Sequence, residues 1–113
     1  MKTDKDYFGG VDFAVTVCAK DGTILDMNEA SRKVNLKDGR EILGQNVLDC
    51  HPEPARTLLA DLLANPRTNI YTIEKKGIKK LIYQTPWYAD GEYAGFMEVS
   101  MPVPFDLPHK IRG

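Results

Sequence analysis

Two residues with reactive side chains, Cys50 and His51, are adjacent near the middle of the chain. A thiol can act as a nucleophile and an imidazole as its general base, so the pair raises the hypothesis of a small thiol enzyme. Catalytic partners must face one another in space, however, and adjacency in the sequence does not provide this. We therefore expect no catalysis and keep the thiol enzyme as an alternative.

Cys18 and His109 are the remaining cysteine and histidine of the chain. The spacing of Cys18 and Cys50 matches no CxxC metal or redox motif. The sequence also contains no glycine-rich phosphate loop, no HExxH motif and no paired carboxylates at a catalytic spacing. These observations favour a binding protein over an enzyme.

Aromatic and basic residues gather in the last third of the chain. The aromatic residues are Tyr83, Trp87, Tyr88, Tyr93 and Phe96. Such side chains either line a ligand pocket or fill the core as cross-strand pairs. The basic residues are Lys75, Lys76, Lys79 and Lys80, around Gly77. Lysines at this density are typical of a solvated turn, where they block pairing between sheet edges.

Length and charge limit the function classes. A chain of 113 residues with a net charge of −1 is the size of one domain and has no basic surplus. We therefore expect no nucleic-acid partner and no binding to an anionic membrane. No apolar run approaches the roughly 20 residues of a membrane span, and the charged N-terminus does not resemble a signal peptide. These features predict a cytoplasmic protein whose cysteines are reduced.

The first half of the chain carries signals for a hairpin and a short helix. Apolar and polar residues alternate over Val11–Cys18, as in a strand, and Asp21-Gly22 is a turn signal. A second strand is expected over residues 23–27. Asn28 is a favourable N-cap for a helix over residues 29–34. A loop with short helical turns should follow around Asp38-Gly39 and Gly44.

The second half predicts a longer helix and three strands. Pro52 and Pro54 are expected in the first helical turn, and Asn65-Pro66 should end the helix. Its apolar stripe consists of Ala55, Leu58, Leu59, Leu62 and Leu63. Strands are predicted over residues 68–74, 78–88 and 93–103, joined by turns at Lys76-Gly77 and Asp90-Gly91. Pro86 should lie at a strand end because it cannot donate a ladder hydrogen bond.

The order of several short motifs resembles the PAS domain, a sensory module of bacterial signalling proteins. The motifs are Asp21-Gly22, Asn28-Glu29-Ala30, Leu43-Gly44 and His51-Pro52-Glu53. The resemblance implies an α+β fold: a five-stranded antiparallel sheet with short helices and one longer helix on one face. It also implies that the fifth strand pairs with the first. The expected organisation is an N-terminal arm at 1–10, a sensor domain at 11–103 and a C-terminal tail at 104–113.

The resemblance further implies a function in signal transduction without catalysis. A PAS module binds a small ligand or a partner protein. In this chain the ligand is expected in a cavity between the apolar helix stripe and the sheet. The candidate pocket residues are His51, Leu58, Leu62, Tyr83, Trp87 and Met97. PAS domains tend to form homodimers through the N-terminal arm and the outer sheet face, and they act on a downstream kinase, cyclase or other regulator. The alternative is a dimerisation module with a filled core and no ligand.

The cofactor is left unknown by the sequence. Some PAS domains bind haem through a histidine of the helical half, and His51 is the candidate iron ligand here. The plainer interpretation is that His51 starts the helix, as in PAS domains that bind no metal. Flavin photochemistry is not expected. The flavin-binding subgroup carries Gly-x-Asn-Cys-Arg-Phe-Leu-Gln, whereas this chain has Val47 at the position of that cysteine, and Cys50 comes three residues later.

Overall fold

The computed structural model describes residues 7–35 and 42–113, and it confirms the predicted order of elements. Residues 1–6 of the predicted arm and the Asp38-Gly39 turn signal lie outside the described residues. The elements are β1 (Ala14–Ala19), β2 (Ile24–Met27), α1 (Glu29–Asn35), the 3-10 helix η1 (Val47–Cys50), α2 (Ala55–Ala64), β3 (Asn69–Lys75), β4 (Ile78–Ala89) and β5 (Glu92–Val103). None of the helices in this described part has the length and apolar character needed to cross a membrane.

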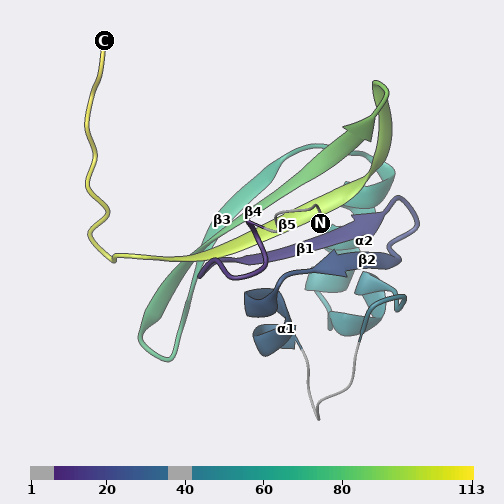
Figure 1. Ribbon diagram of the computed structural model, residues 1–113, viewed down its shortest axis with the longest axis horizontal. Coiled ribbons are helices and arrows are strands. Elements are labelled where there is room, and N and C mark those ends of the chain that lie inside the picture. Colours follow the sequence, from purple (N-terminus) through teal and green to yellow (C-terminus); the bar gives the residue numbers. More distant parts are fainter. Residues whose placement is uncertain (1–6, 36–41) are drawn as a thin grey trace.

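The five strands form one antiparallel sheet in the order β2-β1-β5-β4-β3. The first and last strands of the chain therefore lie side by side in the middle, as the family resemblance implied (Figure 1). Cys18 of β1 is paired with Phe96 of β5, and Thr16 with Glu98. This pairing confirms the α+β fold class and the predicted antiparallel sheet.

The core lies between the helices and one face of this sheet. Cys18 and Phe96 face α2, whose Leu62 is only 1% exposed. The other core residues are Ile24, Met27, Val47, Leu59 and Leu63. Helix α1 is held on the same face, because the hydroxyl of Ser31 hydrogen-bonds the hydroxyl of Thr16. Side chains of a strand alternate between faces, so this register decides which residues can meet a ligand beneath the helices.

Strand β1 begins at Ala14, three residues later than the alternation at Val11 predicted. The carbonyl of Phe13 accepts a hydrogen bond from the side-chain amide of Asn28 at 2.9 Å. That carbonyl is therefore bonded to a side chain instead of a neighbouring strand. The alternation of residue types correctly predicted a strand, but this tertiary contact delays its start to Ala14.

Helix α2 begins at Ala55, so the placement of Pro52 and Pro54 in its first turn was wrong. Pro54 is the N-cap residue and Pro52 precedes it. A proline disfavours the helical conformation of the residue before it, which keeps the segment ahead of Pro54 out of the helix. The predicted end is confirmed, since Asn65 is the C-cap and its backbone N–H donates to the Asp61 carbonyl at 2.8 Å.

Pro86 lies inside β4 and not at a strand end, so this prediction was also wrong. It is paired with Phe96 of β5 on one side. On the other side the pairing with β3 ends at Gln84, which is opposite Asn69. Only one neighbouring strand therefore remains at Pro86, so β4 is an edge strand there, where proline is tolerated.

Candidate ligand cavity

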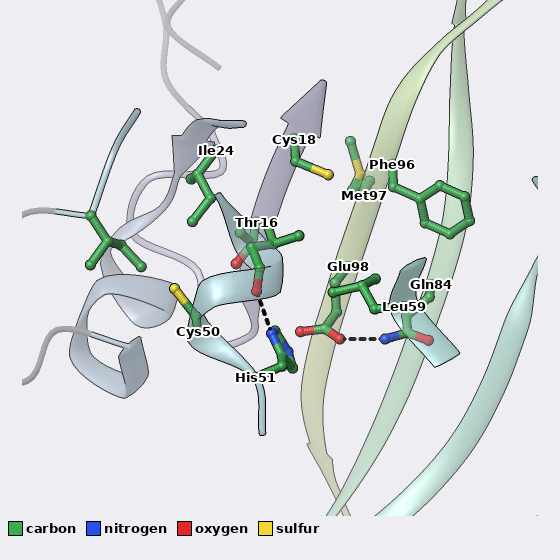
Figure 2. Close-up of a pocket in the computed structure, with 12 residues that line it drawn as sticks. Thr16, Cys18, Ile24, Cys50, His51, Leu59, Gln84, Phe96, Met97 and Glu98 are labelled. Atoms are coloured by element: carbon green, nitrogen blue, oxygen red, sulfur yellow. Dashed lines mark hydrogen bonds between the residues drawn. The ribbon is translucent and has the colours of Figure 1, made fainter. Parts of the chain in front are cut away.

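A cavity of about 50 Å³ lies between the sheet and the segment that contains η1 and α2 (Figure 2). Thr16, Cys18 and Ile24 line it from β1 and β2, and Leu59 lines it from α2. Strands β4 and β5 contribute Gln84, Phe96, Met97 and Glu98. The remaining wall consists of Ile42, Val47, Cys50 and His51. One water takes up about 10–15 Å³ on this scale, so the space suits a few waters or a small organic molecule.

Asn46 fixes the wall that carries Cys50 and His51. Its side-chain oxygen accepts from the Leu48 N–H at 2.9 Å and so caps η1, while its amide donates to the Asp21 carbonyl at 2.8 Å. The Val47 N–H also donates to the carbonyl of Gly22 at 2.8 Å. Gly22 has a φ of 92°, and a Cβ there would lie 2.6 Å from the Asn46 side-chain oxygen. The turn between β1 and β2 therefore holds η1 in place.

His51 is oriented by a hydrogen bond at the end of η1. Its Nδ1 lies 2.7 Å from the Val47 carbonyl oxygen. A carbonyl only accepts, so the proton of this bond is on Nδ1, and in the neutral ring Nε2 is the acceptor. In the chain, His51 is the C-cap residue of η1, and α2 begins only at Ala55. The interpretation that His51 starts the longer helix was therefore wrong.

Three polar side chains form a ladder across the sheet on the face of the cavity. The Asn69 amide donates to Gln84 Oε1 at 2.8 Å, and Gln84 Nε2 donates to Glu98 Oε1 at 2.8 Å. Gln84 is only 7% exposed. Because Gln84 Oε1 is used by Asn69, the amide group presents its NH₂ to Glu98, which fixes the position of the carboxylate.

Both cysteines line the cavity, and both are free thiols. Burial raises the pKa of the Cys18 thiol. Burial, and secondarily the negative charge of Asp49, also raise the pKa of Cys50. The Cys50 thiol donates a weak hydrogen bond to the Asn46 carbonyl at 3.8 Å, and the His51 ring is bonded to Val47. A nucleophilic cysteine needs a lowered pKa and a base that faces it, so this arrangement does not support a thiol enzyme.

The structure brings together only part of the predicted pocket set. His51 and Met97 line the cavity. Leu62 is in the core beneath it, whereas Leu58 is 43% exposed on α2. Tyr83 is paired with Val99, next to the Gln84–Glu98 pair. Since neighbouring residues alternate, Tyr83 lies on the opposite face of the sheet, which we call the outer face.

Trp87 is four residues after Tyr83 on β4, so the alternation places it on the same face as Tyr83. It is also absent from the cavity wall. Its indole N–H donates to the carbonyl of Cys18 at 3.0 Å, across the intervening strand β5. The residue opposite Trp87 on β5 is Gly95. The aromatic cluster predicted from the sequence therefore divides, with Phe96 on the cavity side and Tyr83 on the outer face.

Gln84 and Glu98 supply the polar wall of the cavity, and neither was predicted from the sequence. The same period-two pattern that marks the strands could have indicated them. Glu98 is two residues after Phe96 on β5, so a buried Phe96 predicts that the Glu98 side chain faces the same side of the sheet. Gln84 is paired with Glu98 and therefore lies on that side too. Polar residues at such positions need hydrogen-bond partners once they are buried.

The cavity also bears on metal and haem binding, for which His51 was the candidate iron ligand. The bond from Nδ1 leaves His51 Nε2 free to ligate iron, as haem binding requires. The volume of about 50 Å³, however, suits a few waters and is far too small for a porphyrin. Within the described residues, no group of three or more His, Cys, Asp or Glu side chains is arranged to hold a metal ion. The cavity as it stands therefore fits neither haem nor a protein-bound metal site.

Comparisons with solved structures show the same fold in sensory domains. The PAS domain of BvgS from Bordetella pertussis has a TM-score of 0.66 and 14% identity, covering 87% of this chain and 82% of that chain. A sensory box sensor histidine kinase from Vibrio cholerae has a TM-score of 0.64 and 20% identity, covering 82% and 83%. The PAS domain of the histidine kinase ThkA has a TM-score of 0.63 and 18% identity, covering 80% and 99%. At these identities the likeness shows the fold alone.

Sequence comparison gives the family. No curated protein sequence matches the chain closely enough to indicate a more specific relationship. A family model described as PAS fold matches residues 8–73, which is more than half of the 113 residues. This match confirms the resemblance drawn from the motifs between Asp21 and Glu53, and the five-stranded sheet agrees with it. The chain belongs to the PAS fold family.

Proposed function

We propose that this chain is a sensory module that binds a small ligand in the cavity and passes the signal to a partner protein, without catalysis of its own. The observation that carries the proposal is the polar ladder through the buried Gln84, which ends at Glu98 in a largely apolar cavity. Ligand sites are concave and mostly apolar, with a few polar groups that fix orientation. The raised pKa of Cys50 supports a role without catalysis.

The proposal includes the setting that the family resemblance implies. We propose a cytoplasmic bacterial protein that forms a homodimer and acts on a kinase, a cyclase or another regulator. The similar domains of sensor histidine kinases support a signalling partner of this kind. Residues 11–103 are proposed as the sensor domain, with the His51 wall and the Glu98 wall on either side of the ligand.

A matched pair of leucines on α2 tests ligand binding in the cavity. Leu59 lines the cavity, and its neighbour Leu58 is exposed. Leu59→Phe should fill the space at a cost of about 1–3 kcal/mol in stability, whereas Leu58→Phe leaves the cavity open. Native mass spectrometry of freshly purified protein, with its ultraviolet–visible spectrum, should show a bound small molecule in the wild type and in Leu58→Phe. The molecule should be absent from Leu59→Phe.

An apo mass for the wild type, with no binding of added small-molecule fragments, haem or flavin, would reject the ligand-binding role. The second candidate function would then apply, which is a dimerisation module without a ligand. One observation favours it: the outer face carries a band of apolar side chains, since Leu81 is paired with Met101 and Tyr83 with Ile70 and Val99. Ile70 is 53% exposed. Sedimentation of Tyr83→Glu against Tyr71→Glu, which changes the opposite face of β3, measures whether this band joins two copies.

A further inference from the structure

We infer that the cavity selects a small organic cation, with an ammonium or amidinium group and a short apolar tail. The inference rests on the proposed function and names the class of ligand. Some hydrogen-bonding groups of the cavity wall are already used inside the protein, and others remain for a ligand. The inference follows from this difference.

Glu98 is the first of the remaining groups. Its carboxylate accepts one hydrogen bond, from Gln84, although a carboxylate offers about four acceptor sites. In the described part of the chain no Lys, Arg or His side chain forms an ion pair with it. A carboxylate in a largely apolar cavity is stabilised by a cation, because charge-assisted hydrogen bonds are stronger there than in water.

His51 supplies a second acceptor on another wall. Its Nδ1 is used by the Val47 carbonyl, which leaves Nε2 for a donor from a ligand. Figure 2 shows the His51 ring, from the residue after η1, and the Glu98 carboxylate, from β5, directed into the cavity. A group with several N–H donors, such as an ammonium or amidinium, can serve both acceptors at once.

Several donors of the cavity wall are already used inside the protein. The Thr16 hydroxyl is bonded to Ser31, the Gln84 amide to Glu98, and the Cys50 thiol to the Asn46 carbonyl. Among the described residues that line the cavity there is no lysine or arginine. An anionic ligand would therefore meet Glu98 without a lysine or arginine to compensate its charge, which is unfavourable in a largely apolar cavity.

The apolar part of the wall limits the rest of the ligand. Ile24, Val47, Leu59 and Phe96 are buried core residues that face the same space. A short alkyl tail would displace water from these side chains, which is favourable. The volume of about 50 Å³ restricts that tail to a few carbon atoms.

Three probes of equal length and different charge test the inference: butylamine, butyramide and butyrate. Binding is followed by the shifts of the backbone amide signals of Val47 and Phe96 in ¹H–¹⁵N spectra of the full chain. The protonated amine should bind at least tenfold more tightly than the amide or the carboxylate. Glu98→Gln, which keeps the shape and removes the charge, should abolish that preference. Glu92→Gln, at the exposed start of β5, should preserve it.

Each outcome decides the inference. Equal or tighter binding of butyramide or butyrate would overturn the preference for a cation and leave ligand binding in the cavity intact. Absence of binding by all three probes would also overturn it, and native mass spectrometry would then decide the proposed function separately. The comparison of probes on the wild type does not depend on whether Glu98→Gln folds.

Discussion

Asn28 shows how one polar side chain can organise several segments. It is 4% exposed, and its Oδ1 accepts the N–H groups of Val15 and Ser31. Its Nδ2 donates to the carbonyls of Phe8 and Phe13, both at 2.9 Å. The predicted role as N-cap of α1 is confirmed by the bond from Ser31. The other three bonds join the N-terminal segment, β1 and α1 at one point.

Asn28→Ala should destabilise the fold by about 3 kcal/mol, because it leaves buried backbone groups without partners. Chemical denaturation measures the change in the free energy of unfolding. Asn65→Ala is the control, since Asn65 is exposed and caps only the end of α2. We expect that control to lose less than about 1 kcal/mol. Equal losses for the two variants would contradict the central role of Asn28.

The two thiols should both react slowly near neutral pH. Burial raises the pKa of Cys18, and burial together with Asp49 raises the pKa of Cys50. The thiolate is the reactive form, so a raised pKa lowers its population at pH 7 and moves the increase in rate to higher pH. Alkylation followed by mass spectrometry should show Cys50 reacting before Cys18, because Cys50 is exposed. Fast stoichiometric labelling of Cys50 at pH 7 would revive the thiol-enzyme hypothesis.

Among the elements, the C-terminal end of α2 is held by polar contacts to β5 and to the segment before β3. The Tyr93 hydroxyl, at the start of β5, donates to the Leu63 carbonyl in the last turn of α2 at 3.0 Å. Asp61 of α2 forms an ion pair with Arg67 at 2.6 Å, just before β3. The carbonyls of a final helical turn lack partners within the helix, so these contacts stabilise the end of α2.

Gly95 lets three strands come close together. A Cβ at this position would clash with the backbone carbonyl of Cys18 and would lie 2.7 Å from Trp87 Nε1. Gly95→Ala should therefore destabilise the protein by about 3 kcal/mol, as overpacking does when the neighbour is backbone. Gly10→Ala is the matched control, because nothing lies within 4 Å of a Cβ there. Thermal unfolding should separate the two variants, and a neutral Gly95→Ala would refute this account of Trp87.

At the scale of the whole molecule, the helices cover one face of the sheet and the C-terminal tail extends away from it (Figure 1). Residues 104–113 are exposed throughout. The N-terminal segment differs, because the carbonyls of Phe8 and Gly9 accept hydrogen bonds from Asn28 and from the backbone of Glu29. The two ends of the chain therefore contribute unequally to stability.

Truncation tests this difference. Removing residues 104–113 should change the free energy of unfolding by less than about 0.5 kcal/mol, as expected for exposed residues without buried contacts. A chain that begins at Val11 loses two acceptors of the Asn28 and Glu29 bonds and should be less stable by about 2 kcal/mol. Denaturation curves of both truncated chains and the full chain provide the measurement. The reverse order of stabilities would contradict the pairing of Phe8 with Asn28.

The sequence by itself determined the elements, because the signals for them are local. Alternation marked the strands, and Lys76-Gly77 and Asp90-Gly91 marked two turns in which both residues have positive φ. Asn28 and Asn65 marked the start of α1 and the end of α2 as caps. The motif order then identified the family, which the match over residues 8–73 confirms.

Only the tertiary structure decided which side chains meet. Periodicity shows that Tyr83 and Gln84 face opposite sides of a strand, but it cannot say which side the helices cover. The pairing of β1 with β5 decides this, since it places Glu98 beside Thr16 beneath the helices. The position of His51 depends likewise on Asn46, which contacts a turn 25 residues earlier. Such contacts join distant parts of the chain, so no local pattern of residues contains them.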